Sequence, residues 1–187
     1  MKLVVGLGNP GKEYEFTRHN AGFIILDNFL RHIGNPIMHE KFNGIYYEYF
    51  YNNEKIIFLK PQKYINLSGE VIKDFVNYYK INIEDILIIN DDMDILIGNY
   101  KLKSSGSSAG HNGLKNIEQE LKTNEYKRLK IGISRNKEIT TADYVLGKFS
   151  KEEFDKLNEV VKESVFILED YLNMSFLDLM NKYNKKN

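Results

Sequence analysis

Four consecutive aliphatic residues, Ile86-Leu87-Ile88-Ile89, form a run that is far too short to span a membrane but has the length of a strand. Such a run suits a central strand that is covered on both faces. Further strands are expected at residues 2–7, 99–103 and 128–133. A hairpin is expected where two strand-like runs flank Asn52-Asn53.

Segments with apolar residues at helical spacing lie between and after these strands. Because strands and helices alternate, the sequence predicts an α/β domain whose sheet carries helices on both faces. A length of 187 residues is ample for one domain and short for two. We therefore expect one domain over 1–187, with helices at 151–183 packing on the same core. The other expected helices are 20–33, 66–79 and 113–122.

The composition excludes several classes of function. The chain has no cysteine, so it has no thiolate nucleophile and no cysteine-ligated zinc. A strand begins almost at the first residue and no signal-peptide pattern precedes it, which predicts a cytoplasmic protein. Because the formal net charge is zero, a nucleic-acid partner would have to be met by a local basic patch.

The segment GLGNPGKEYEFTRHNAGF, residues 6–23, is the strongest candidate for a functional site. It follows an apolar strand and combines glycines, a proline and polar side chains that cannot bury much apolar surface. Within it, His19 stands between Arg18 and Asn20. An imidazole in such surroundings is the best candidate in this sequence for a general base.

The same segment contains the spacing G-x-G-x-x-G at Gly6–Gly11, which is the fingerprint of dinucleotide-binding proteins. That fingerprint requires a helix that opens within the glycines. Residues 12–20 carry no apolar stripe and predict an irregular loop, and Asp27 lies inside a helical pattern and not at a strand end. The pattern therefore disfavours a nicotinamide cofactor, while a glycine-rich turn without a ligand remains an alternative.

Short polar side chains follow several of the predicted strands. Because ligands of open α/β sheets collect at the carboxyl ends of strands, these residues predict a shared site. Amides suit such a site since they donate and accept hydrogen bonds at once. Each residue also has a purely structural interpretation as a turn or cap residue. They are Asn9, Asn66, Asp91 and Asn112.

The acidic stretch Asp91-Asp92-Met93-Asp94 could in principle bind a divalent cation. The spacing of an EF-hand is missing, and aspartates after a strand are common turn formers. We favour a different role, in which one carboxylate pairs with a histidine and stabilises its protonated form. No metal is expected. His111 is a weaker second candidate for the site and could simply support its loop.

Five stretches, taken together and in order, make the chain resemble the bacterial peptidyl-tRNA hydrolases. The resemblance covers nearly the whole chain and implies a cytoplasmic, monomeric esterase without a cofactor, built on a mixed, twisted sheet wrapped by helices. The implied reaction cleaves the ester between a peptide and the 3′ end of tRNA, and no membrane partner is implied. The matching stretches are 6–23, 61–69 (PQKYINLSG), 90–95 (NDDMDI), 109–115 (AGHNGLK) and 128–134 (RLKIGIS).

The resemblance also assigns roles by matching position. His19 falls at the catalytic base, Asp91 at the carboxylate that supports it, and Asn9 at the residue that separates blocked from free aminoacyl groups. Further positions match substrate-binding residues, namely Tyr14, Tyr64, Asn66 and Asn112. Basic residues that face tRNA phosphates correspond to Lys101, Lys103 and Lys130.

Four positions depart from the usual family pattern: SSGSSAG before His111 has fewer glycines, Asn90 replaces a histidine, Ile65 a methionine and Lys130 an arginine. None of these changes removes a chemical group that the reaction needs. A catalytically silent RNA-binding module on the same fold is the rival interpretation. The presence of His19, Asp91 and Asn9 argues against it.

Overall fold

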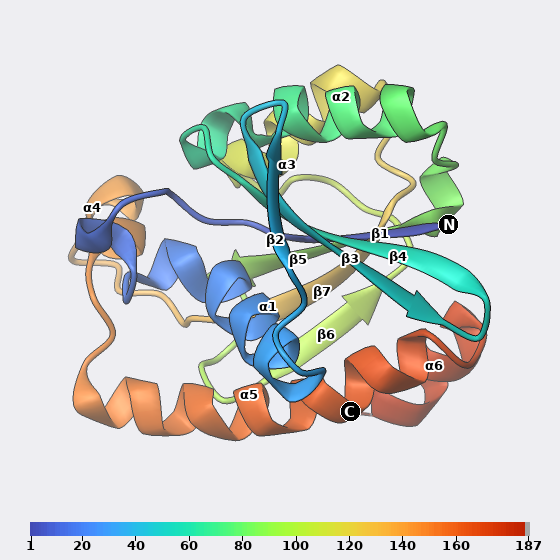
Figure 1. The fold of residues 1–187 in the computed structure, drawn as a ribbon. Helices are drawn as coiled ribbons and strands as arrows, with labels where there is room; N and C mark the ends of the chain where they lie inside the picture. Colours follow the sequence, from blue (N-terminus) through green and yellow to red (C-terminus); the bar gives the residue numbers. More distant parts are fainter. Residues whose placement is uncertain (186–187) are drawn as a thin grey trace.

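The computed structural model describes residues 1–185 and arranges them around one mixed, seven-stranded sheet (Figure 1). The strand order within this part is β2-β3-β4-β1-β5-β7-β6. The pairs β1–β4, β1–β5 and β5–β7 are parallel, and the remaining pairs are antiparallel. The strands are β1 (Lys2–Gly6), β2 (Met38–Lys41), β3 (Gly44–Tyr51), β4 (Glu54–Pro61), β5 (Ile86–Asp92), β6 (Tyr100–Lys103) and β7 (Lys127–Gly132).

Helices cover both faces of the sheet (Figure 1). α2 and α3 lie on one face, and α1, α5 and α6 lie on the other. Short 3₁₀ turns occur at Lys12–Tyr14, Arg18–Asn20, Ile65–Leu67 and Ile83–Asp85. The helices are α1 (Ala21–His32), α2 (Ser68–Tyr79), α3 (Asn112–Leu121), α4 (Thr141–Leu146), α5 (Lys151–Tyr171) and α6 (Phe176–Tyr183).

The central strands are apolar throughout because successive side chains feed two separate cores. Val4 and Leu87 belong to the core under α1 and α5, whereas Val5 and Ile88 belong to the core under α2 and α3. All four side chains are fully buried. Burying such a side chain stabilises the fold by about 1.5–3 kcal/mol. Because alternate side chains need cover on opposite faces, the sheet lies as the middle layer between two layers of helices.

The expected strands and the expected helices are present, with shifts of a few residues at their ends. Two elements were not foreseen. The edge strand β2 is exposed and lacks an apolar pattern, and α4 is too short to show helical periodicity. The structural interpretation of Asn66 as a helix cap is wrong, and Ser68 does not cap α2 either. The cap position is Leu67, without a side-chain hydrogen bond, and the Ser68 hydroxyl donates to the Ile65 carbonyl instead.

The segment after β1 is not a helix. It forms two separate 3₁₀ turns, Lys12–Tyr14 and Arg18–Asn20, and α1 begins only at Ala21. The first α-helix therefore begins ten residues after Gly11 and not within the glycine spacing Gly6–Gly11. The dinucleotide-binding interpretation loses its structural basis, because it requires a helix that begins there. Among residues 1–185, no helix has both the length and the apolar character required to cross a membrane.

The parallel strands β1, β4 and β5 end at the same edge of the sheet. The turn Arg18–Asn20 follows β1, the turn Ile65–Leu67 follows β4, and Asp91 lies near the end of β5. The fold therefore brings three segments that are far apart in the sequence to one place, as the strand-end argument predicted.

Candidate active site

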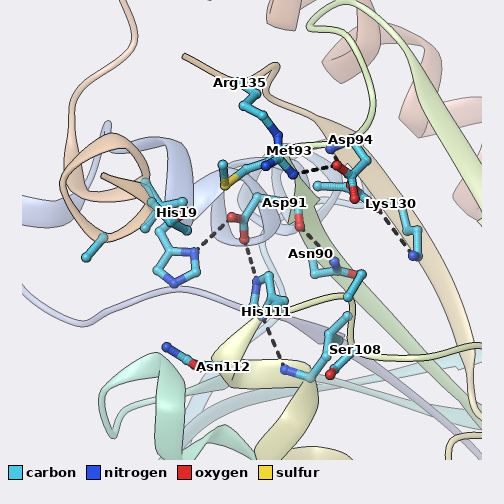
Figure 2. A pocket seen from close by; sticks show the side chains of 17 residues that line it. His19, Asn90, Asp91, Met93, Asp94, Ser108, His111, Asn112, Lys130 and Arg135 are labelled. Carbon is cyan, nitrogen blue, oxygen red and sulfur yellow. Dashed lines mark hydrogen bonds and ion pairs between the residues drawn. The ribbon is translucent and has the colours of Figure 1, made fainter. Parts of the chain in front are cut away.

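Asp91 lies between two imidazole rings at the end of β5 (Figure 2). Its Oδ2 is 2.8 Å from Nδ1 of His19, and its Oδ1 is 2.8 Å from Nε2 of His111. The three side chains are 9%, 2% and 10% exposed in the order His19, Asp91, His111. The Asp91 contact uses Nδ1 of His19, so Nε2 is the ring nitrogen that remains for chemistry.

The pairing sets the charge of both groups. Burial opposes the charged form of His19, but the Asp91 charge and hydrogen bond outweigh it, so the pKa of His19 lies above its ordinary value of 6.5. Burial likewise opposes the ionised form of Asp91. The two neighbouring imidazoles outweigh that effect and hold the pKa of Asp91 well below its ordinary range. Asp91 is thus a carboxylate at neutral pH.

The segment that carries His19 is bound to α4 and to the start of α5. The Arg18 guanidinium donates to both carboxylate oxygens of Glu153, at 2.9 and 3.3 Å, and to the Tyr144 carbonyl at 3.0 Å. Thr17 forms an isolated antiparallel bridge with Lys148. A two-point arginine–carboxylate contact fixes direction as well as distance. The position of the His19 ring therefore depends on α4 and α5.

Asn20 connects the His19 turn to Asn9. Its side-chain amide accepts from the Asn9 backbone N–H at 2.8 Å and donates to the Asn9 carbonyl at 3.0 Å. Both residues are buried, at 2% and 5% exposure. The amide of Asn20 thus holds the backbone of Asn9 at two points, as a neighbouring strand would.

The side chain of Asn9 already has a partner on one side. Its Oδ1 accepts from the backbone N–H of Ile65 at 2.7 Å. A backbone N–H can only donate, so this contact identifies the oxygen and leaves Nδ2 as the free end. The sequence suggested a side chain that offers a donor and an acceptor together. The structure instead makes Asn9 available as a donor.

The other predicted substrate-binding residues lie on the segments that follow β1 and β4 and at the start of α3. Tyr14 and Tyr64 meet edge to face with ring centroids 6.2 Å apart, and Tyr64 is 58% exposed. Asn66 lies in the exposed 3₁₀ turn after β4. Asn112 is the exposed first residue of α3 and lines the cavity beside His19. These amides keep their hydrogen-bonding groups open to solvent or to a ligand.

A cavity of about 460 Å³ adjoins His19 and Asp91 (Figure 2). Its wall contains two ion pairs: Lys130 Nζ lies 3.3 Å from Asp92 Oδ2, and Arg135 lies 2.6 Å from Asp94 Oδ1. The remaining wall comes from β5, the loop 108–112 and α4. This volume lies within the range of small-molecule sites.

The three predicted phosphate-binding lysines share one side of the β6–β7 pair, because Lys101 and Lys130 are register partners and Lys103 alternates with Leu102. Lys101 is exposed and Lys103 half-buried. Lys130 differs from the expected surface lysine, since it is 7% exposed and paired with Asp92. Its ammonium belongs to the cavity wall.

His19, Asp91 and His111 also form the one cluster of potential metal ligands within the described residues 1–185, with ligand atoms within 4.8 Å of one another. The hydrogen bonds of His111 disfavour a metal there. Its Nδ1 accepts from the Leu114 backbone N–H at 3.2 Å, so the ring proton must sit on Nε2, the nitrogen that faces Asp91. A metal bound to Nε2 would move the proton of the neutral ring to Nδ1. Nδ1 could then no longer accept the hydrogen bond from Leu114 that caps α3.

Several residues of the site were missed or undervalued in the sequence. His111 ranked below His19, yet it contacts the same carboxylate. Arg18 and Asn20 drew notice only as neighbours of His19, Ile65 only as a departure from the family pattern, and Glu153 carried no signal. Apart from the Asn20–Asn9 contact within one segment, these contacts join residues from different elements, so no local spacing could have revealed them.

Comparison with known proteins agrees with this geometry. The family model of peptidyl-tRNA hydrolase matches residues 3–187. The chain belongs to the peptidyl-tRNA hydrolase family. The family match spans the sheet except its first residue, Lys2, the helices α1 to α6 and every residue of the site described above.

Individual relatives show the same likeness. The peptidyl-tRNA hydrolase of Bacillus cereus (strain Q1) is 44% identical over 185 residues, which cover 98% of this chain and 100% of that protein. The one from Listeria monocytogenes serotype 4a (strain HCC23) is 44% identical over 186 residues, with all of both chains covered. The crystal structure of peptidyl-tRNA hydrolase from Acinetobacter baumannii matches with a TM-score of 0.92 and 31% identity, covering 100% and 96% of the two chains.

Proposed function

We propose that this protein hydrolyses the ester bond between a peptide, or an N-blocked amino acid, and the 3′ end of tRNA. The observation that carries the proposal is the buried 2.8 Å contact between His19 and Asp91 beside an open polar cavity, in a chain of the peptidyl-tRNA hydrolase family. The products are a free peptide and a tRNA that can be charged again. This activity recycles tRNA from abandoned translation.

His19 is the general base in this proposal. Its Nδ1–H is held by Asp91, so the lone pair of Nε2 can take a proton from a water molecule as that water attacks the ester carbonyl. The imidazolium that forms is stabilised by the adjacent carboxylate. The proton then passes to the ribose oxygen as the ester bond breaks, which returns His19 to its neutral form.

Exposed amides would stabilise the charge that develops on the ester oxygen. Asn66 and Asn112 are exposed, and each carries a side-chain N–H group that can donate a hydrogen bond. Donors directed at a developing oxyanion commonly contribute the largest part of such catalysis. The spacing G-x-S-x-G occurs at residues 106–110, but its Ser108 lies within the loop between β6 and α3 and not on the sharp strand-to-helix turn of a nucleophile elbow, so the attack is assigned to water and not to a serine.

Asn9 would distinguish blocked from free substrates through its single free donor. Because Oδ1 is occupied by Ile65, Nδ2 can donate to the carbonyl of a peptide bond. A free aminoacyl ester presents an ammonium at that place, which also only donates. The two donors repel each other, so the free ester is disfavoured.

The tRNA would meet the protein along the cavity and the β6 edge. We assign the 3′-terminal nucleoside to the cavity beside His19 and the phosphates to Lys101, Lys103 and Lys130, of which Lys130 lines the cavity and pairs in register with Lys101. Since the net charge of the chain is zero, this local cluster has to supply the attraction. Tyr14 and Tyr64 provide aromatic surface beside Asn9 for the peptide.

We further propose that residues 1–187 act as one domain and as a monomer in the cytoplasm. All the residues assigned to the site come from one chain, so no second subunit is needed to complete it. Translation in the cytoplasm generates the substrate. Light scattering of the purified protein tests the oligomeric state.

The deciding experiment is a turnover assay with N-acetyl-aminoacyl-tRNA. We expect multiple turnover by the wild-type protein and a loss of roughly 10²-fold or more for His19→Ala, with little change in tRNA binding. His32→Ala is the matched control, because His32 is an exposed histidine at the end of α1 whose hydrogen bond goes to the Glu169 carboxylate and not to a residue of the site.

Tight tRNA binding without turnover in the wild type would favour the silent RNA-binding module. Near-normal turnover of His19→Ala would disprove the assignment of the base. In that case His111 would be the next candidate, because it contacts the same carboxylate.

A further inference from the structure

His111 makes two hydrogen bonds of opposite kind. It is the N-cap residue of α3, where its Nδ1 accepts from the backbone N–H of Leu114 at 3.2 Å. Its Nε2 lies 2.8 Å from Asp91 Oδ1. The side chain is 10% exposed, and its ring centroid is 4.9 Å from that of His19. Histidine is an uncommon helix cap, so its presence here calls for a reason beyond capping.

The two contacts allow only one protonation state. Leu114 N–H must donate, so Nδ1 has to be an acceptor without a proton. Nε2 therefore carries the proton and donates it to Asp91. A second proton on Nδ1 would break the cap and place a positive charge at the N-terminus of α3, where the helix dipole opposes it. The first turn of α3 thus holds His111 neutral.

The other charged groups around this centre are already paired. Arg18, next to His19, is bound to Glu153. In the cavity wall, Lys130 is paired with Asp92 and Arg135 with Asp94. The charge that His19 experiences most directly is therefore that of Asp91. A donor on the second oxygen of Asp91 decreases the negative charge that reaches His19.

We propose that His111, kept as a neutral Nε2–H imidazole by the first turn of α3, positions Asp91 and moderates the charge that Asp91 presents to His19. This inference rests on the proposed hydrolase function. In it His111 is a positioning residue, since it acts on the base through the carboxylate. It also couples the start of α3, and the loop before it, to the protonation of the base.

Two substitutions separate the contacts of His111. His111→Asn retains an acceptor at the position of Nδ1 and a good helix cap, but it cannot reach Asp91. His111→Gln retains a donor at the position of Nε2, but it loses the cap. We expect His111→Asn to move the acid limb of kcat/KM to higher pH by roughly half a unit or more, because an uncompensated Asp91 holds the proton on His19 more strongly.

His111→Gln should leave the acid limb near its wild-type position and lower the melting temperature. If His111 serves only as a helix cap, the results reverse. His111→Asn would then keep the wild-type pH profile and His111→Gln alone would be impaired. That reversed pattern would overturn the proposal.

Nitrogen NMR of the histidine rings tests the same idea without any turnover. We expect His111 to show an unprotonated Nδ1 and a protonated Nε2 throughout the pH range in which His19 titrates. The midpoint of the His19 titration should rise in His111→Asn. Protons on both nitrogens of His111 within that range would refute the inference, even if the hydrolase function itself were correct. A wild type that binds tRNA but never hydrolyses the ester would contradict the function alone.

Discussion

Replacing Asp91 with asparagine should be more damaging than removing its side chain altogether. In the wild type the carboxylate accepts two hydrogen bonds, one from each imidazole. An amide has one acceptor and one donor. His111 cannot turn its donor away, because Leu114 holds the other nitrogen. The amide oxygen in Asp91→Asn will therefore face His111 and its NH₂ group will face His19.

The NH₂ group then forces Nδ1 of His19 to accept and puts the proton on Nε2, the nitrogen that has to act as base. One lost charge-assisted hydrogen bond costs about 1.5–3 kcal/mol, which is roughly 10- to 150-fold in rate. The wrong tautomer adds to this loss. The equivalent change in a Ser-His-Asp triad lowers kcat by about 10⁴-fold. We expect a decrease of roughly 10³- to 10⁴-fold for Asp91→Asn.

Asp91→Ala leaves His19 free to adopt either tautomer, so its kcat should fall by only roughly 10²-fold. Both variants should lower the kinetic pKa on the acid limb, because the charge that raises the pKa of His19 is gone. The assay is hydrolysis of N-acetyl-aminoacyl-tRNA from pH 5 to pH 9, on the usual range of histidine titration. An Asp91→Asn enzyme that is faster than Asp91→Ala, or an unshifted acid limb, would refute this reasoning.

Three further outcomes follow from the same structure. Asn9→Asp should lower the kcat/KM ratio of N-blocked over free aminoacyl esters by roughly tenfold or more, because it replaces the free donor with an acceptor that attracts an ammonium; an unchanged ratio would make Asn9 a turn residue. Lys103→Ala should make the slope of log K for tRNA binding against log salt shallower by roughly 0.7–0.9 and spare a short ester substrate, whereas equal losses on both substrates would place Lys103 at the chemical site or in the fold. The depressed pKa of Asp91 stabilises the folded state at pH values above 3.8, the ordinary pKa of this carboxyl group. The raised pKa of His19 stabilises it at pH values below 6.5, the ordinary pKa of the imidazole. The difference in melting temperature between wild type and Asp91→Ala should accordingly be widest between those values and narrow on either side, and a flat difference across pH would contradict the pairing.

Local sequence patterns were sufficient to predict the architecture. The aliphatic run Ile86–Ile89 and the helical periodicities around it predicted a sheet with helices on both faces, because burial depends on which residues repeat along a few turns or a few strand positions. The polar residues at strand ends predicted the edge where the site lies. β2 and α4 escaped notice because one is an exposed edge strand and the other is a helix of only six residues.

What the sequence alone determined is the inventory of the site: a histidine, a carboxylate and several amides on loops that end at one sheet edge. Only the tertiary structure decided which atom of each residue is free. It directs Oδ1 of Asn9 to Ile65, joins Arg18 to Glu153 and sets His111 against Asp91. These are directional contacts between distant elements. Hydrogen-bond direction depends on backbone atoms that the fold brings together, and no spacing of residues along the chain records it.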